Sequence, residues 1–136
     1  MRARQLTLTL AAGVLAGACT PATPPGGGAA GLSPDGARIY AGNCIACHQQ
    51  DGHGIAGVYP ALAASPVVLG DPVELGSWIV QGKRPASMPA GRYTTVMPQF
   101  PWLRAADAAA LLTFLRGNFG NQAAAVDAAT LAPVFP

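Results

Sequence analysis

Charge is scarce in this chain of 136 residues, and the charges that are present form no pattern. Asp, Glu, Lys and Arg make up 10% of the sequence, with eight basic residues against six acidic ones. Because no basic stripe exists, the sequence lacks the electrostatic footprint of a nucleic-acid-binding protein. Because no block of like charges exists either, we expect no strong electrostatic steering of partners.

Long hydrophobic runs and alternating strand patterns are missing as well. The apolar run at the N-terminus, residues 6–15, is too short to span a bilayer as a mature helix. Alanine inflates the hydrophobic content of 51%, so few large apolar side chains are available for a core. A domain this small usually needs stabilisation beyond its hydrophobic core, and a large bound cofactor would provide it. The pattern predicts short helices joined by long loops.

The first 18 residues are typical of a signal peptide. Arg2 and Arg4 precede the apolar run, and small residues follow it up to Ala18. Removing this segment leaves six basic residues (8 − 2) against six acidic ones, so the exported chain is close to neutral. We therefore expect a periplasmic protein.

Cleavage can be read in two ways. The stretch LAGAC resembles a bacterial lipobox, which would make Cys19 the lipid-modified N-terminus, although Leu15 stands four residues before Cys19 and not the usual three. The residues Ala16-Gly17-Ala18 also fit ordinary signal cleavage. A Pro/Gly-rich tether over residues 19–32 favours the lipoprotein, because such a composition suits a leash between membrane and domain.

Helical segments are expected over residues 33–43, 71–82, 103–116 and 123–131. The first would open with Ser33 as N-cap and Pro34 at the first helical position. The second would start at Asp71 and end at Gly82. The third would stop at Gly117 and has a poorly capped start, whereas the fourth is Ala-rich and weak and would drape along the surface. The domain is placed at residues 33–121, with a C-terminal extension over 122–136.

The motif CIACH carries the chemistry, with Cys44 and Cys47 three residues apart and His48 directly after them. In an exported chain this spacing indicates covalent attachment of haem c, because one helical turn brings both thiols to the two vinyl groups. His48 would then be the proximal iron ligand. A redox-active cysteine pair would need a thioredoxin-like context, which the sequence lacks. A structural zinc site would need a second Cys/His pair, which the sequence also lacks.

The sixth ligand of the iron is left open by the residues alone. His53 lies only five residues after His48 and is not expected to reach the opposite face. Met88 and Met97 both precede proline, so the local sequence does not separate them. A thioether ligand opposite histidine would raise the reduction potential relative to two histidines. Either methionine could instead be a core residue.

The chain resembles a class I c-type cytochrome domain in two segments, YAGNCIACHQQDGHGIAGVYPALAASP and YTTVMPQFPWLRAADAAALLTFLRGNFGN. The likeness covers residues 33–121 and is nearest to the cytochrome modules of quinohaemoprotein alcohol and sugar dehydrogenases and of oxidases. It implies an all-α fold, with short helices and long loops wrapped around one covalently bound haem c. The family has a Ser-Asp pair where this chain has Arg104-Ala105 at the start of the last helix.

The resemblance also implies site residues. The family's MPxF segment matches residues 97–100, which makes Met97 the second iron ligand. Pro60 would accept a hydrogen bond from the His48 ring through its carbonyl, and Leu62 would pack on the haem face. On the first helix, Gly36 and Tyr40 would meet Phe114 of the last helix. The resemblance does not identify the groups that bind the haem propionates. Four side chains offer donors for them, although each could equally be an ordinary surface or core residue, and Tyr93 is favoured: Trp78, Arg84, Arg92 and Tyr93.

A monohaem cytochrome of this kind is expected to be an electron carrier and not an enzyme. Its donor would be a membrane-associated dehydrogenase or a quinol-linked complex, and its acceptor an oxidase or another cytochrome. It could be a free carrier or a fixed redox subunit, held at the membrane through lipid on Cys19. The alternative is a small peroxidase or gas sensor, which would require an open iron site.

Overall fold

A computed structural model describes residues 34–88, 93 and 95–135. The expected signal peptide, the tether with Cys19, and the residues Ser33 and Arg92 lie outside this range. The described elements are α1 Gly36–Asn43, α2 Ile45–His48, α3 Pro66–Leu69, α4 Pro72–Gln81, α5 Ala105–Gly117 and the 3-10 turn η1 Ala132–Val134. The described residues form no strand beyond one isolated bridge, so the all-α expectation is confirmed. None of their helices is long and apolar enough to cross a membrane.

Helix α1 starts later than the sequence suggested. Its N-cap is Asp35, whose side chain accepts a hydrogen bond from the Arg38 amide at 3.2 Å. Pro34 precedes the helix, so the expected start with Pro34 at the first helical position is wrong. The reason is that the Asp35 carboxylate reaches an unpaired amide of the first turn, as a good N-cap does. The helix ends at Asn43, as expected.

The bounds of α4 and α5 follow their local signals. Asp71 caps α4 by accepting from the Val73 amide at 2.8 Å, and Gly82 ends the helix at a φ of 70°. Helix α5 has Arg104 at its N-cap with no side-chain cap, which confirms the poorly capped start. The helix begins at Ala105, two residues later than the expected start at Leu103. At this start the Arg104 guanidinium binds the Asp107 carboxylate at 2.7 Å.

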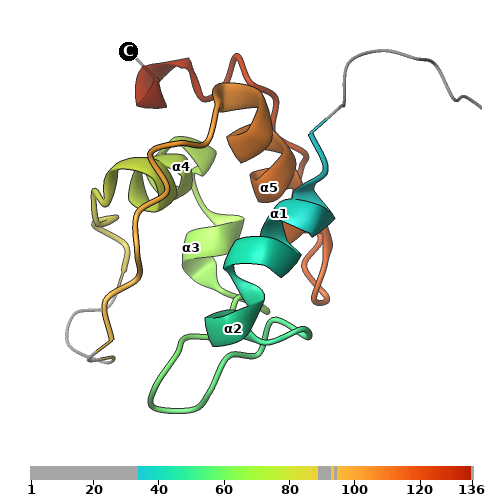
Figure 1. The fold of residues 1–136 in the computed structure, drawn as a ribbon, viewed down its shortest axis with the longest axis vertical. Helices are drawn as coiled ribbons and strands as arrows, with labels where there is room; N and C mark the ends of the chain where they lie inside the picture. Colours follow the sequence, from blue (N-terminus) through green and yellow to red (C-terminus); the bar gives the residue numbers. More distant parts are fainter. Residues whose placement is uncertain (1–33, 89–92, 94, 136) are drawn as a thin grey trace, which may run out of the picture. The chain divides into compact units, whose positions relative to one another are not determined.

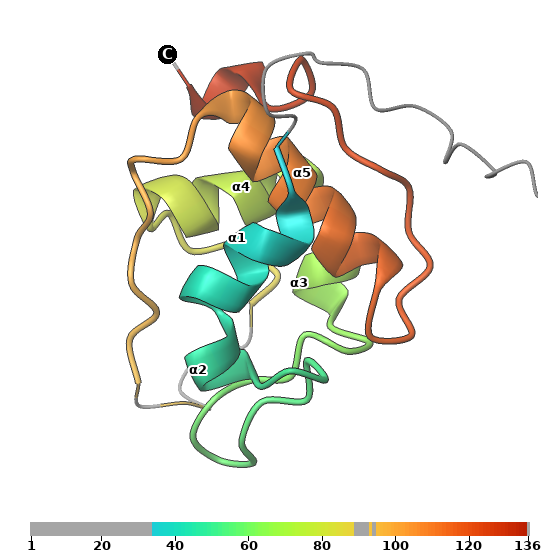
Figure 2. The same ribbon diagram turned by 45° about the vertical axis from the view of Figure 1, so that its right-hand side comes forward.

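Helices α1 and α5 cross at very close range, as both Figure 1 and Figure 2 show. A Cβ atom on Gly36 would lie 2.1 Å from the Ala110 carbonyl oxygen and 2.8 Å from Cβ of Phe114. The rings of Tyr40 and Phe114 pack with their centroids 5.4 Å apart. The expected meeting of Gly36 and Tyr40 with Phe114 is therefore confirmed. This crossing sets the position of α2, which follows α1 directly.

The C-terminal segment does not form the expected helix over residues 123–131, and it does not merely drape over the surface. Thr113 of α5 holds it in a non-helical course, accepting from the Val126 amide at 2.9 Å and donating to the Val126 carbonyl at 3.1 Å. Leu131 is fully buried, and a Cβ on Gly76 of α4 would lie 3.2 Å from its side chain. The segment thus completes the core over α4 and α5.

Candidate cofactor site

One turn of backbone brings Cys44, Cys47 and His48 together. Cys44 caps the end of α1, where its amide donates to the Tyr40 carbonyl at 2.8 Å, and α2 follows at once. The His48 amide donates to the Cys44 carbonyl at 2.9 Å, which closes the turn. Neither cysteine is in a disulfide, and burial raises the pKa of the Cys44 thiol to about 11, with the Cys47 charge adding to the shift.

His48 is buried and its ring is held in one orientation. Its Nδ1 lies 2.9 Å from the Pro60 carbonyl oxygen, which is the pairing that the resemblance implies. Because a proline carbonyl can only accept, Nδ1 carries the proton and Nε2 keeps a free lone pair. Burial lowers the pKa of His48 more than this hydrogen bond raises it. A neutral imidazole in a fixed tautomer is the form that ligates a metal.

Gly54 allows the Pro60 backbone to lie close to His48, a role that the sequence reasoning missed. Its amide donates to the His48 carbonyl at 3.0 Å, and its φ is 63°. A Cβ at this position would lie 2.4 Å from the Tyr59 carbonyl oxygen and 2.6 Å from that of Pro60. Only glycine permits this approach of two backbone segments. The signal available in the sequence was that three glycines, Gly52, Gly54 and Gly57, lie between His48 and Pro60.

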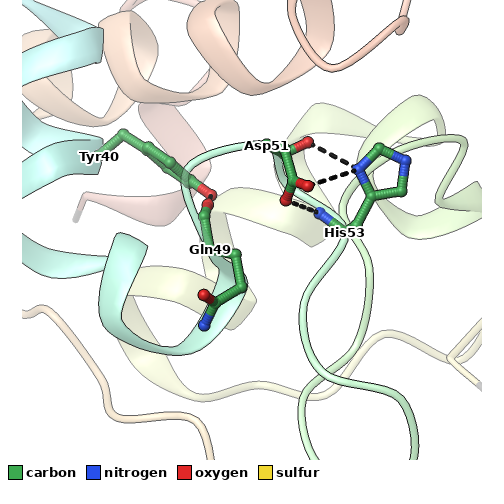
Figure 3. A network of polar contacts seen from close by, with 4 residues as sticks. All are labelled: Tyr40, Gln49, Asp51 and His53. Atoms are coloured by element: carbon green, nitrogen blue, oxygen red, sulfur yellow. Dashed lines mark hydrogen bonds and ion pairs between the residues drawn. The ribbon is translucent and has the colours of Figure 1, made fainter.

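Tyr40 fixes the turn after α2, as Figure 3 shows. Its hydroxyl donates to the Gln49 carbonyl at 2.5 Å, and Gln49 has a left-handed φ of 61° that a residue with a side chain rarely adopts. Burial, reinforced by the nearby Cys44 and Asp51, raises the pKa of Tyr40 to about 12. The phenol therefore stays protonated and keeps donating, which holds the turn beside His48.

A cavity of about 560 Å³ lies between the CIACH turn and the segment around Met97. It contains every expected site residue that the structure describes: Cys44, Cys47, His48, Pro60, Leu62, Tyr93 and Met97. Met88, Trp78 and Arg84 line it as well, so the lining alone does not choose between the two methionines. The rest of the wall is mainly apolar: Val67, Val68, Leu75, Ile79, Phe100, Leu111 and Leu115.

The residues of this cavity fit a haem. Two thiols for covalent attachment and one oriented imidazole share a wall, and the cavity offers thioether sulfur as a further soft ligand for iron. Its volume lies within the usual range for cofactor pockets, and its apolar walls suit a porphyrin. Among the described residues that line it, none is an aspartate or glutamate.

His53 lies outside this cavity, as expected. Its amide donates to the Asp51 carboxylate at 3.1 Å, and its Nδ1 lies 3.0 Å from the Asp51 carbonyl oxygen. Figure 3 shows the ring turned toward Asp51, and its side chain is 68% exposed. The chain has only two histidines, so His48 alone brings an imidazole to the cavity.

Asn121 holds one wall of the cavity and was missed as a site residue. Its side chain is buried, accepts from the Ala64 amide at 2.8 Å and donates to the Leu62 carbonyl at 3.1 Å. A further bond to the Leu115 carbonyl, 2.8 Å long, ties this wall to α5. No local pattern in the sequence marks Asn121, because two of its partners lie more than 50 residues away.

Comparison with known proteins gives one consistent result. The family model for cytochrome c matches residues 33–118. The cytochrome c subunit of a quinone alcohol dehydrogenase from Gluconobacter oxydans (strain 621H) is 33% identical over 90 residues, which are 65% of this chain and 19% of that subunit. The corresponding subunit from Komagataeibacter europaeus is 33% identical over 96 residues, covering 67% of this chain and 20% of the subunit.

A shorter match is closer in sequence. A cytochrome c-552 from Thermus thermophilus is 57% identical over 37 residues, 27% of this chain and 24% of that protein. The chain thus spans about a fifth of the length of the alcohol dehydrogenase subunits that it matches.

Proposed function

We propose, because this chain belongs to the cytochrome c family, that it passes single electrons from a membrane-associated dehydrogenase or quinol-linked donor to an oxidase or another cytochrome. The family establishes haem c as its cofactor, and Cys44 and Cys47 fit the CxxCH attachment motif. Haem c, when bound, supplies an iron that takes up and releases one electron. The supporting observation is the apolar cavity that contains both the oriented His48 ring and Met97.

Different residues of the chain would bind different parts of the haem. We assign the two iron ligands to His48, kept neutral and oriented by Pro60, and to Met97. Leu62 and the other apolar side chains exclude water from the cavity, which limits reorganisation as the charge of the site changes. Tyr93 lines the cavity and is assigned as a hydrogen-bond donor to a propionate.

The alternative, a peroxidase or gas sensor, needs a distal group that moves protons at an open iron position. His53 is the one other histidine of the chain, and it lies outside the cavity and faces Asp51. The described lining contains no carboxylate that could take its place. These observations favour a closed six-coordinate site and therefore the carrier.

The proposed donor is a dehydrogenase because two of the relatives are cytochrome subunits of quinone alcohol dehydrogenases. Thr95, which lines the cavity, donates to the Val58 carbonyl at 3.0 Å and joins two loops that carry exposed apolar side chains. Ile55 and Val58 are 42% and 43% exposed, and Val96 is 85% exposed. A close-to-neutral chain with these exposed apolar side chains suits docking through apolar contact.

The carrier proposal is tested by the spectrum of the purified full chain with its haem. We expect a c-type pyridine haemochrome and low-spin iron in both oxidation states, because both axial positions are filled by side chains. Azide added to the oxidised protein should leave the spectrum unchanged. High-spin ferric iron that binds azide or peroxide readily would contradict the carrier and favour the open-site alternative.

We also propose that lipid on Cys19 tethers the domain to the periplasmic face of a membrane. The basis is the LAGAC stretch and the Pro/Gly-rich residues that follow it. We expect the unaltered chain in the membrane fraction and a Cys19→Ser variant in the soluble periplasmic fraction, with Thr20→Ser behaving like the unaltered chain. A Cys19→Ser variant that still fractionates with membranes would argue against lipidation.

A further inference from the structure

Arg116 is a buried cation in the last turn of α5. Only 7% of the residue is exposed, and its guanidinium donates to three main-chain carbonyls. Nε donates to the Ala124 carbonyl at 2.9 Å, and Nη1 donates to those of Val68 and Gly70, each at 2.8 Å. One side chain thus ties the C-terminal segment and the residues around α3 to the end of α5.

The charge of Arg116 is solvated by dipoles and not cancelled by an anion. None of the ion pairs formed by the described residues includes it. A guanidinium stays protonated in proteins, so the site keeps a full positive charge. The carbonyls of Val68, Gly70 and Ala124 make this burial tolerable, because their negative ends point at the cation.

This charge lies directly behind the wall of the cavity. Val68, whose carbonyl accepts from Nη1, lines the cavity, and so does Leu115, the residue before Arg116. No carboxylate belongs to the described part of that wall. Buried charges are screened much less than exposed ones, so a cation here acts on the cavity through protein and not through water.

We propose that Arg116 sets the reduction potential of this cytochrome, holding it high by disfavouring the extra positive charge of the oxidised state. With haem c held by His48 and Met97, as proposed above, oxidation adds one positive charge inside the cavity. The buried guanidinium repels that charge, and the burial around a haem is one of the factors that set its potential. Arg116 also positions the cavity wall through its hydrogen bond to Val68. The effect of its charge on the potential must therefore be separated by experiment from the effect of its hydrogen bonds.

Two substitutions make that separation in the full-length protein with its haem. Arg116→Gln removes the charge but keeps amide donors, and Arg116→Lys keeps the charge but loses the planar fork. We expect redox titration to give a clearly lower midpoint potential for Arg116→Gln and a potential close to the unaltered protein for Arg116→Lys. Both variants should unfold at a lower temperature, because both lose hydrogen bonds. The drop in potential should persist at high salt, since a buried charge is poorly screened.

Arg38→Gln is the matched control, because it removes the same charge from a side chain that is 81% exposed. Its potential should change much less than that of Arg116→Gln. Equal shifts in Arg116→Gln and Arg116→Lys, or no shift in Arg116→Gln, would overturn the proposal. If Arg116→Gln does not fold, a lowered potential in Arg116→Lys alone overturns it, and an unchanged one supports it. The low-spin spectrum of the unaltered protein tests the ligand set separately.

Discussion

Met97→Ala is expected to abolish the far-red absorption band of the oxidised protein and to lower its reduction potential. The band reports methionine bound to ferric haem, and a thioether ligand raises the potential relative to other axial pairs. Met97 lies in a segment that the fold holds firmly, since the Phe100 amide donates to the Ile79 carbonyl at 2.9 Å and Thr95 binds Val58. An absorption spectrum and a redox titration of the purified variant measure both effects.

Met88 supplies the matched control, because it lines the same cavity and also precedes proline. Met88→Ala should keep the far-red band and the potential. Met97→His should restore low-spin iron at a lower potential, since histidine replaces the thioether that raises it. Loss of the band in Met88→Ala and its retention in Met97→Ala would reverse the assignment of the second ligand.

Gly36→Ala is expected to cost about 3 kcal/mol of unfolding free energy, at the upper end of typical overpacking effects. The added Cβ would lie 2.1 Å from the Ala110 carbonyl oxygen and 2.8 Å from Cβ of Phe114. Both atoms are part of α5 itself and not the ends of flexible side chains, so the two helices would have to separate. Denaturant unfolding of the haem-loaded protein, with a low-spin spectrum as the check on the site, measures the loss.

Gly42→Ala is the control for this prediction, since it makes the same substitution in the same helix. Nothing lies within 4 Å of a Cβ at Gly42, so the change should stabilise the protein by about 0.5–1 kcal/mol through helix propensity. If Gly36→Ala unfolds like the unaltered protein, the close crossing of α1 and α5 is not a determinant of stability.

The features that could be predicted from the sequence are those set by neighbouring residues. Cys44, Cys47 and His48 lie on one turn because their spacing of three and one residues matches a helix. Asp71 and Gly82 bound α4 as capping chemistry requires. Pro60 belongs to a different class, since its role came from resemblance and not from any local rule. The 2.9 Å contact with His48 is consistent with that role.

The features that escaped prediction depend on partners far away in the chain. Asn121 binds Ala64, and Arg116 binds Val68, 57 and 48 residues apart respectively. The composition of the Ala-rich C-terminal residues favoured a helix, but Thr113 binds their backbone instead and Leu131 enters the core. At the start of α1 the sequence predicted Ser33 as the N-cap, but the carboxylate of Asp35 caps the helix instead. Tertiary contacts decided the first three cases, and local propensity did not.

The two proposed iron ligands differ in how the chain reaches them, and this difference orders the assembly of the protein. The attachment motif occupies five consecutive residues, so an unfolded chain already presents it complete. Met97 follows His48 by 49 residues (97 − 48), and bringing it to the iron requires closure of that long loop. Attachment can therefore precede folding, whereas the second ligand arrives only when the fold closes. A denatured chain is accordingly expected to keep its covalently attached haem, and Met97 is the only proposed ligand that would leave the iron.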